Sequence, residues 1–201
     1  NNGDENNAFQ RLYKLDNYYD VEQVDIGQIN VDFNAFDLVV FSDVKSFPKG
    51  LIDPVKTFMN NGGHVVITPD QDANIQSINQ LMAAVKGPSV SGMSRIQLPL
   101  EQIDYKKSFY ENIFESEEDI TMPSIAHYYP TSTSGGSYLT SLLNVKNGAP
   151  FITQLQFGQG KLYWQAAPNN AAGNKWSKHA LFSAIYLRIA ERSVEKFPLY
   201  Y

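Results

Sequence analysis

Short apolar runs and segments with helical spacing alternate along the first half of the chain. Residues 36–41 and 64–68 are continuous apolar runs rich in β-branched and aromatic side chains, typical of strands buried on both faces of a parallel sheet. Between them, apolar residues recur at helical spacing from Leu51 to Met59, and Asn61-Gly62-Gly63 then offers a residue able to take positive φ. A strand, a helix and a strand within about 33 residues predict a right-handed parallel crossover.

Helical spacing predicts three further helices, at residues 7–16, 75–85 and 175–192, and Gly87-Pro88 closes the second of them. An extended segment is expected from Val21 to Ile26.

Strand patterns dominate the last third of the chain. Asn147-Gly148 between two extended segments is a good hairpin signal, residues 158–160 form a second turn, and residues 132–137 read as a Ser/Thr/Gly loop. The strands predicted after the helix at residues 75–85 are 94–100, 139–145, 151–157 and 161–166. Together the elements predict a single α/β domain over residues 1–201, with a mainly parallel sheet and a C-terminal half rich in β-hairpins.

Composition limits the function classes. A hydrophobic share of 43% suffices for a packed core, and a net charge of −5 without a basic run argues against nucleic acid as a partner. The absence of cysteine excludes a disulfide frame, a thiolate metal site and a cysteine nucleophile. The longest apolar stretches fall far short of the roughly 20 residues that span a bilayer, and no signal peptide is visible.

Both ends of the sequence look cut. The chain opens on Asn1-Asn2-Gly3 without a methionine and stops at the apolar aromatic residues 197–201. We expect it to continue into further structure, because an aromatic stub of this kind is awkward in water.

Polar residues follow three of the predicted parallel strands. Because ligands gather where the carboxyl ends of such strands meet, we expect a small, mildly acidic rim there. Its members are Ser42, Asp43, Asp70, Gln71, Asn169 and Asn170. The alternative is that they are turn and capping residues, with Asp72 or Asn74 as the N-cap of the helix that starts at Ile75.

Sequence motifs for known chemistry are missing or incomplete. The segment from Asp70 begins like a calcium loop, but Ile75 and Leu81 stand where that loop needs glycine and glutamate. The turn after residue 68 is not G-x-S-x-G, and no glycine-rich phosphate loop precedes a helix. His64, His127 and His179 show no metal-ligand spacing, so we interpret them as structural, and we expect neither a metal nor a cofactor.

An aromatic cluster lies in the middle of the chain. Tyrosines keep a polar tip that suits interfaces, so these residues could form an interaction face, or else pack a satellite core. The residues are Phe109, Tyr110, Phe114, Tyr128 and Tyr129.

Several segments, taken in order, resemble a known family. Residues 36–41 and 58–67 resemble the early sheet of class I glutamine amidotransferase-like domains. The amidotransferase-like domain of large bacterial membrane proteins with a BatA-type (aerotolerance-type) N-terminal region is similar at residues 108–115, 122–129, 157–163 and 177–182.

The resemblance implies a three-layer, flavodoxin-like fold, tethered by transmembrane helices outside residues 1–201 on the periplasmic side of the inner membrane. It also implies that a first strand, normally preceding residues 2–4, is trimmed. Catalysis does not carry over, because Asp70 stands where the family's active members have cysteine, and no His-x-Glu pair occurs.

We therefore expect a non-catalytic interaction or sensory domain that binds a protein partner, other domains of its own chain, or a small envelope ligand. One alternative is a hydrolase with Asp70 as general base, helped by Asp43 or His179. Another is a structural spacer, which would have neither a pocket nor an apolar surface patch.

Overall fold

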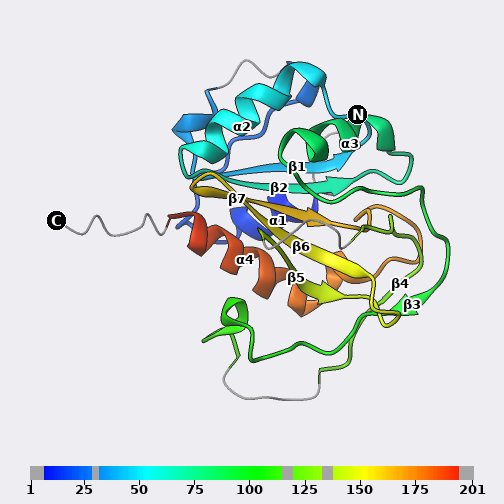
Figure 1. The fold of residues 1–201 in the computed structure, drawn as a ribbon. Helices are drawn as coiled ribbons and strands as arrows, with labels where there is room; N and C mark the ends of the chain where they lie inside the picture. The colour runs from blue at the N-terminus through cyan, green and yellow to red at the C-terminus, as the bar shows by residue number, and fades with distance from the viewer. Residues whose placement is uncertain (1–6, 29–31, 115–119, 133–137, 195–201) are drawn as a thin grey trace.

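The computed structural model describes residues 7–28, 32–114, 120–132 and 138–194 (Figure 1). The helices are α1 (Ala8–Lys14), α2 (Ile52–Asn60), α3 (Ile75–Ala84) and α4 (Ala180–Val194). The strands are β1 (Leu38–Val44), β2 (His64–Pro69), β3 (Leu98–Pro99), β4 (Ser124–Ile125), β5 (Leu139–Asn144), β6 (Pro150–Phe157) and β7 (Gly160–Gln165).

A five-stranded mixed sheet in the order β1-β2-β7-β6-β5 organises the fold. β1, β2 and β7 are parallel neighbours, whereas β6 is antiparallel to β7 and β5 is antiparallel to β6. Only β6 is therefore reversed. The predicted parallel crossover from β1 through α2 to β2 and the hairpin between β5 and β6 are both confirmed.

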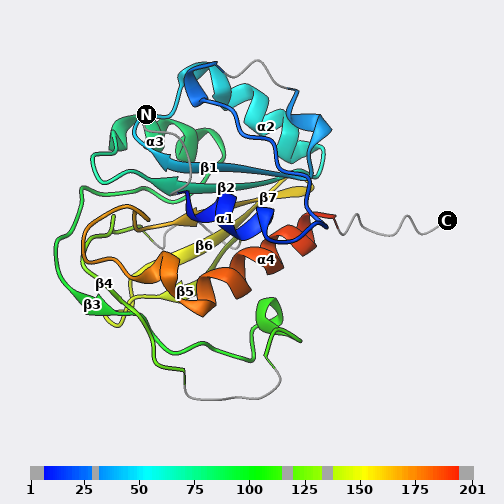
Figure 2. The ribbon, with the colours of Figure 1, turned by 180° about the vertical axis from the view of Figure 1, so that it is seen from behind.

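Helices cover both faces of this sheet (Figures 1 and 2). On one face, Phe58 of α2 and Leu81 of α3 pack in a core with Val65 of β2. On the other, Phe9 of α1 belongs to a second core that includes Val66. Since β2 is covered from both sides, all six of its residues are buried, which explains its unbroken apolar run.

Backbone segments meet closely where β7 begins. A Cβ on Gly160 would lie 2.0 Å from the carbonyl oxygen of Gly63 and 2.7 Å from that of Met59. Only glycine lets β7 pass this close to the end of α2. Glycine at position 160, in the turn predicted at residues 158–160, is therefore required by packing.

Two predicted elements are shorter than expected. The helix predicted at 175–192 consists of a 3-10 turn, Trp176–Lys178, and then α4, because His179 is extended (φ −91°, ψ 145°). The Nδ1 atom of His179 accepts from the N–H of Leu181 at 3.3 Å, as a capping group does. The strand predicted at 94–100 is reduced to β3, since Pro99 has no N–H to continue a ladder.

The extended segment expected from Val21 to Ile26 forms no strand and leads into a 3-10 turn at Ile26–Gln28. Residues 133–137 of the predicted loop lie outside the described residues. Across the described ranges, no helix is long and apolar enough to cross a membrane.

Candidate functional site

The carboxyl end of β1 is bulged. Its register with β2 shifts between Phe41 and Val44, and Asp43 has a φ of 50°, a left-handed conformation that is uncommon for residues other than glycine. The N–H of Asp43 donates to Thr68 Oγ1 at 2.8 Å, which holds the bulge against β2. At this bulge the carboxylate of Asp43 reaches the loop after β7 and forms a hydrogen bond with it.

The Asp43 carboxylate ties this loop to β1. Its Oδ1 accepts from the N–H of Asn169 at 3.1 Å, and its Oδ2 accepts from Ser42 Oγ at 3.0 Å. Burial raises the pKa of Asp43; the Asn169 and Ser42 hydrogen bonds oppose that rise, and the charge of Asp70 adds to it. A half-buried carboxyl with a raised pKa at a strand end is a typical functional-site candidate.

Asp70, directly after β2, holds its own turn and the loop after β7. Its Oδ1 accepts from the N–H of Asp72 at 2.8 Å, and its Oδ2 accepts from Asn170 Nδ2 at 3.2 Å. Asn74 is the N-cap of α3, with its Oδ1 accepting from the N–H of Ser77 at 3.2 Å. One of the two caps predicted for this helix is therefore confirmed.

Tyr129 closes the turn after β2 from a distant part of the chain. Its hydroxyl lies 2.9 Å from the carbonyl oxygen of Asp70 and 3.0 Å from that of Gln71, and it accepts from the N–H of Ala73 at 3.1 Å. The side chain of Gln71 is left exposed beside it. The structure thus gathers the six predicted strand-end residues at one edge of the sheet.

A buried polar network that sequence reasoning missed supports this edge. Gln165, the last residue of β7, is 1% exposed, and its Oε1 accepts from Trp176 Nε1 and from the Tyr186 hydroxyl, both at 2.6 Å. Its Nε2 donates to Asn169 Oδ1 at 3.0 Å. That bond orients the Asn169 amide, whose Nδ2 is buried and has no hydrogen-bond partner in the structure. The one signal in the sequence was a glutamine directly after the apolar run 162–164.

Four of the five rings that could form an interaction face lie in the core instead, and the fifth, Phe114, is half-buried. Phe109, Tyr110, Tyr128 and Tyr129 are only 2–3% exposed. All three tyrosine hydroxyls bond within the fold: besides the Tyr129 bonds described above, Tyr110 donates to the carbonyl oxygen of Leu142 at 2.9 Å, and Tyr128 accepts from an asparagine amide at 3.0 Å. The expected interaction face is therefore wrong: Phe109, Tyr110 and Tyr128 join the core under α1 and α4, and Tyr129 joins the core under α2 and α3, so these rings pack the middle of the chain onto the sheet.

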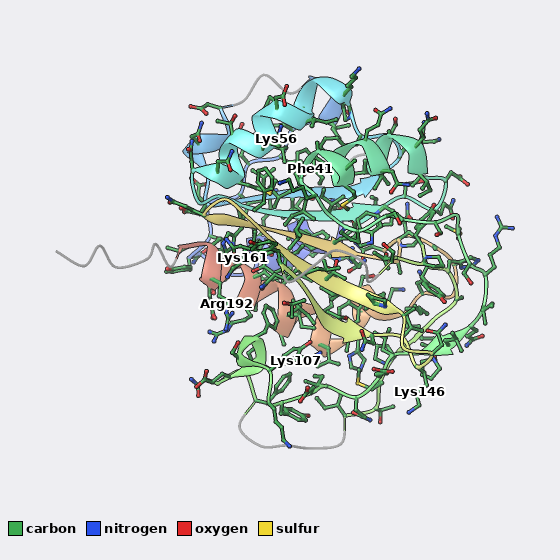
Figure 3. The ribbon with its side chains drawn as sticks, viewed as in Figure 1. Phe41, Lys56, Lys107, Lys146, Lys161 and Arg192 are labelled. Carbon is green, nitrogen blue, oxygen red and sulfur yellow. The ribbon has the colours of Figure 1, made fainter. Side chains whose placement is uncertain are left out.

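The histidines stand apart from these carboxylates. His64 is 4% exposed, and burial, with help from Lys161 and Arg192 (Figure 3), lowers its pKa to about 4. His179 Nε2 lies 3.0 Å from the carbonyl oxygen of Thr121. Among the residues that the structure describes, no histidine bonds to Asp43 or Asp70, and no group of three or more His, Cys, Asp or Glu could hold a metal ion.

Comparison with known proteins gives a fold and no family. No family model and no curated protein matches the chain. The structure is similar to the cytoplasmic protein STM1381 from Salmonella typhimurium LT2, with a TM-score of 0.72 and 13% identity over 92% of this chain and 85% of that one. The cytoplasmic protein STM3548 from Salmonella typhimurium is also similar, with a TM-score of 0.59 and 11% identity over 92% of this chain and 78% of that one.

A third similar structure is a β-galactosidase from Bacillus circulans sp. alkalophilus, with a TM-score of 0.58 and 13% identity over 81% of this chain but only 23% of the enzyme. At such identities the likeness shows an α/β fold alone. The three names mention neither a glutamine amidotransferase nor a BatA-type protein.

Proposed function

We propose that this chain is a single, non-catalytic binding domain on a three-layer, flavodoxin-like scaffold. One observation carries the proposal: each of the four carboxylate oxygens of Asp43 and Asp70 accepts a hydrogen bond from the domain itself. The scaffold assignment is supported by the helices on both faces of the sheet and by the family resemblance.

A general base must direct an oxygen or nitrogen lone pair at the substrate and must have a pKa suited to accepting its proton. Asp70 instead holds the turn to Asp72 and a side chain of the next loop. No cysteine exists in the chain, and His179 is engaged with Thr121 and Leu181. The hydrolase alternative with Asp70 as base therefore has less support than binding.

The rim offers neutral polar groups to a ligand. Ser42, Gln71 and Asn170 contribute hydroxyl and amide groups. The Nδ2 of Asn169 is buried and has no hydrogen-bond partner, so a ligand oxygen that reaches it would satisfy this donor. We infer that this edge binds a small, uncharged polar molecule through an oxygen placed at Asn169.

Amide-detected NMR titration with glycerol, glucose and acetamide tests this inference. We expect shifts confined to the strand-end residues with at least one probe, and their loss in Asn169→Ala but not in Asn17→Ala, an exposed asparagine after α1. Absence of any such shift would remove the binding claim. Turnover in a screen of amide, ester and glycoside substrates, abolished by Asp70→Asn, would instead establish the hydrolase alternative.

The cellular setting remains a proposal from the resemblance alone. It comprises a tether formed by helices outside residues 1–201, a periplasmic position at the inner membrane, and a partner that is a separate protein or another domain of the same chain. Compartment-specific reporter fusions to the complete gene product test it, and a cytoplasmic signal would overturn it.

A further inference from the structure

The turn after α1 approaches the last turn of α4 at another part of the molecule (Figure 2). An open groove lies between these two segments. It has a volume of about 460 Å³ and is lined by Asp16, Tyr18, Tyr19, Glu191 and Val194. None of these residues belongs to the strand-end site, so a ligand here would be independent of the function proposed above.

Tyrosine rings form an angled wall in this groove. The rings of Tyr18 and Tyr19 are nearly perpendicular, at 88°, with centroids 5.3 Å apart. Tyr19 also packs edge-on against the buried Tyr13, at 5.4 Å and 63°, and the Tyr13 hydroxyl donates to the carbonyl oxygen of Tyr186 at 2.9 Å. Tyr19 is thus held by a ring anchored to α4, whereas Tyr18 is 71% exposed and available to a ligand.

The turn that carries these rings is held in place by Asp16. Asp16 Oδ1 accepts from the N–H of Tyr18 at 2.9 Å, and the carbonyl oxygen of Asp16 accepts from the N–H of Tyr19 at 3.2 Å. The wall is therefore formed before any ligand arrives, which reduces the ordering that binding requires.

Negative charge faces the wall. Burial raises the pKa of Tyr19, and the carboxylates of Glu191 and Asp16 raise it further, so both charges act at the same ring. Arg188 pairs with Glu191 Oε2 at 3.2 Å but also donates to the carbonyl oxygen of Glu111. Within the described ranges, Asp16 forms no ion pair.

The cationic side chain of Arg192, also on the last turn of α4, is directed elsewhere. Its guanidinium lies 5.3 Å from the centroid of the Phe109 ring and donates to the carbonyl oxygen of Ser108. The groove is therefore not filled by this cation, and the charged groups among its lining residues are the carboxylates of Asp16 and Glu191.

We propose that this groove binds an organic cation of the alkylammonium class, with the charged group against the faces of Tyr18 and Tyr19 and beside Asp16 and Glu191. Aromatic faces attract cations through the ring quadrupole, and pairs of angled rings with nearby carboxylates are suited to ammonium groups. A hard metal ion would instead require a shell of six or more oxygens, and two carboxylates beside aromatic rings do not supply it.

Calorimetric titration of the whole chain with choline tests the proposal, with dimethylbutanol, the uncharged carbon isostere of choline, as matched ligand. We expect choline to bind more tightly than the isostere, and Tyr18→Ala to weaken choline binding by about 3- to 30-fold. Tyr138→Ala is the control, because Tyr138 is a second tyrosine of similar exposure, 68%. Asp16→Asn keeps the bond to the Tyr18 N–H while removing the charge, and should weaken binding with a reduced dependence on salt.

A third ligand, N-acetyl-lysine methylamide, distinguishes the source of the ammonium group. Tighter binding of this compound than of choline would assign the groove to a lysine on a protein partner, and the reverse to a free small cation. No binding of any cation, equal binding of choline and its isostere, or equal effects of Tyr18→Ala and Tyr138→Ala would overturn the proposal.

Discussion

Replacing Asp43 with alanine tests whether this carboxylate holds the edge of the sheet together. The change removes the acceptors of the Asn169 N–H and the Ser42 hydroxyl, and each such bond contributes about 0.5–1.5 kcal/mol, or more when the acceptor is charged. It also places alanine at a φ of 50°, which costs roughly 1 kcal/mol. Asp43 is half-buried, and alanine has no charge to desolvate, so part of this loss is offset. We expect the free energy of unfolding to fall by about 2–3 kcal/mol in total.

Urea unfolding followed by circular dichroism measures this loss as a lower midpoint at unchanged slope. Asp43→Gly removes the same hydrogen bonds without the strain, so it should lose about 1 kcal/mol less than Asp43→Ala. Asp20→Ala, at an exposed aspartate, should stay within about 0.5 kcal/mol of the unmodified chain. A wild-type midpoint for Asp43→Ala, or equal losses for alanine and glycine, would refute the reasoning.

Three further predictions concern the same framework. Burial raises the pKa of Asp43 in the folded state. The stabilisation that comes from its protonated form is therefore complete below the unfolded-state pKa of about 4 and is lost as pH rises through the folded-state pKa. Asp43→Asn should lessen the decline in stability above about pH 4, measured by urea titrations run from acid to neutral pH. Gly160→Ala places a Cβ 2.0 Å from a backbone oxygen and should lower the unfolding free energy by more than about 3 kcal/mol, whereas Gly50→Ala, with no atom within 4 Å, should change it little. Gln165→Leu leaves two buried donors without their acceptor and should lower stability by about 2–5 kcal/mol, seen as a depressed melting temperature; an unchanged value would show that the network is dispensable.

Regular periodicity explains what could be predicted from the sequence. The runs that became β1 and β2 are apolar because both faces of the sheet are covered, and the helix between them was visible from one apolar face. The six strand-end residues could be placed together for a topological reason, since parallel strands end at one edge. Their partners could not be predicted, because a contact such as Asp43 with Asn169 spans 126 positions of the chain.

Long-range packing explains the errors. Tyr128 and Tyr129 are of a residue type that is common at interfaces. Their burial depends on how the chain from residue 101 onward folds back onto the sheet, which no local sequence pattern encodes. The break at His179 arises from a single side-chain cap, too small a signal to interrupt an apolar helical period. The groove beside α4 is formed by segments from the two ends of the chain, so neither segment alone predicts it.

The two indoles of the chain occupy opposite sides of the sheet. Trp164 lies in the core under α2 and α3 and donates to Thr131 Oγ1 at 3.0 Å, whereas Trp176 lies in the core under α1 and α4. With only two tryptophans in the sequence, the fluorescence of each single-tryptophan variant reports on one layer. Coincident emission transitions would make the whole domain one cooperative unit, and separated ones would reveal a layer that melts before the other.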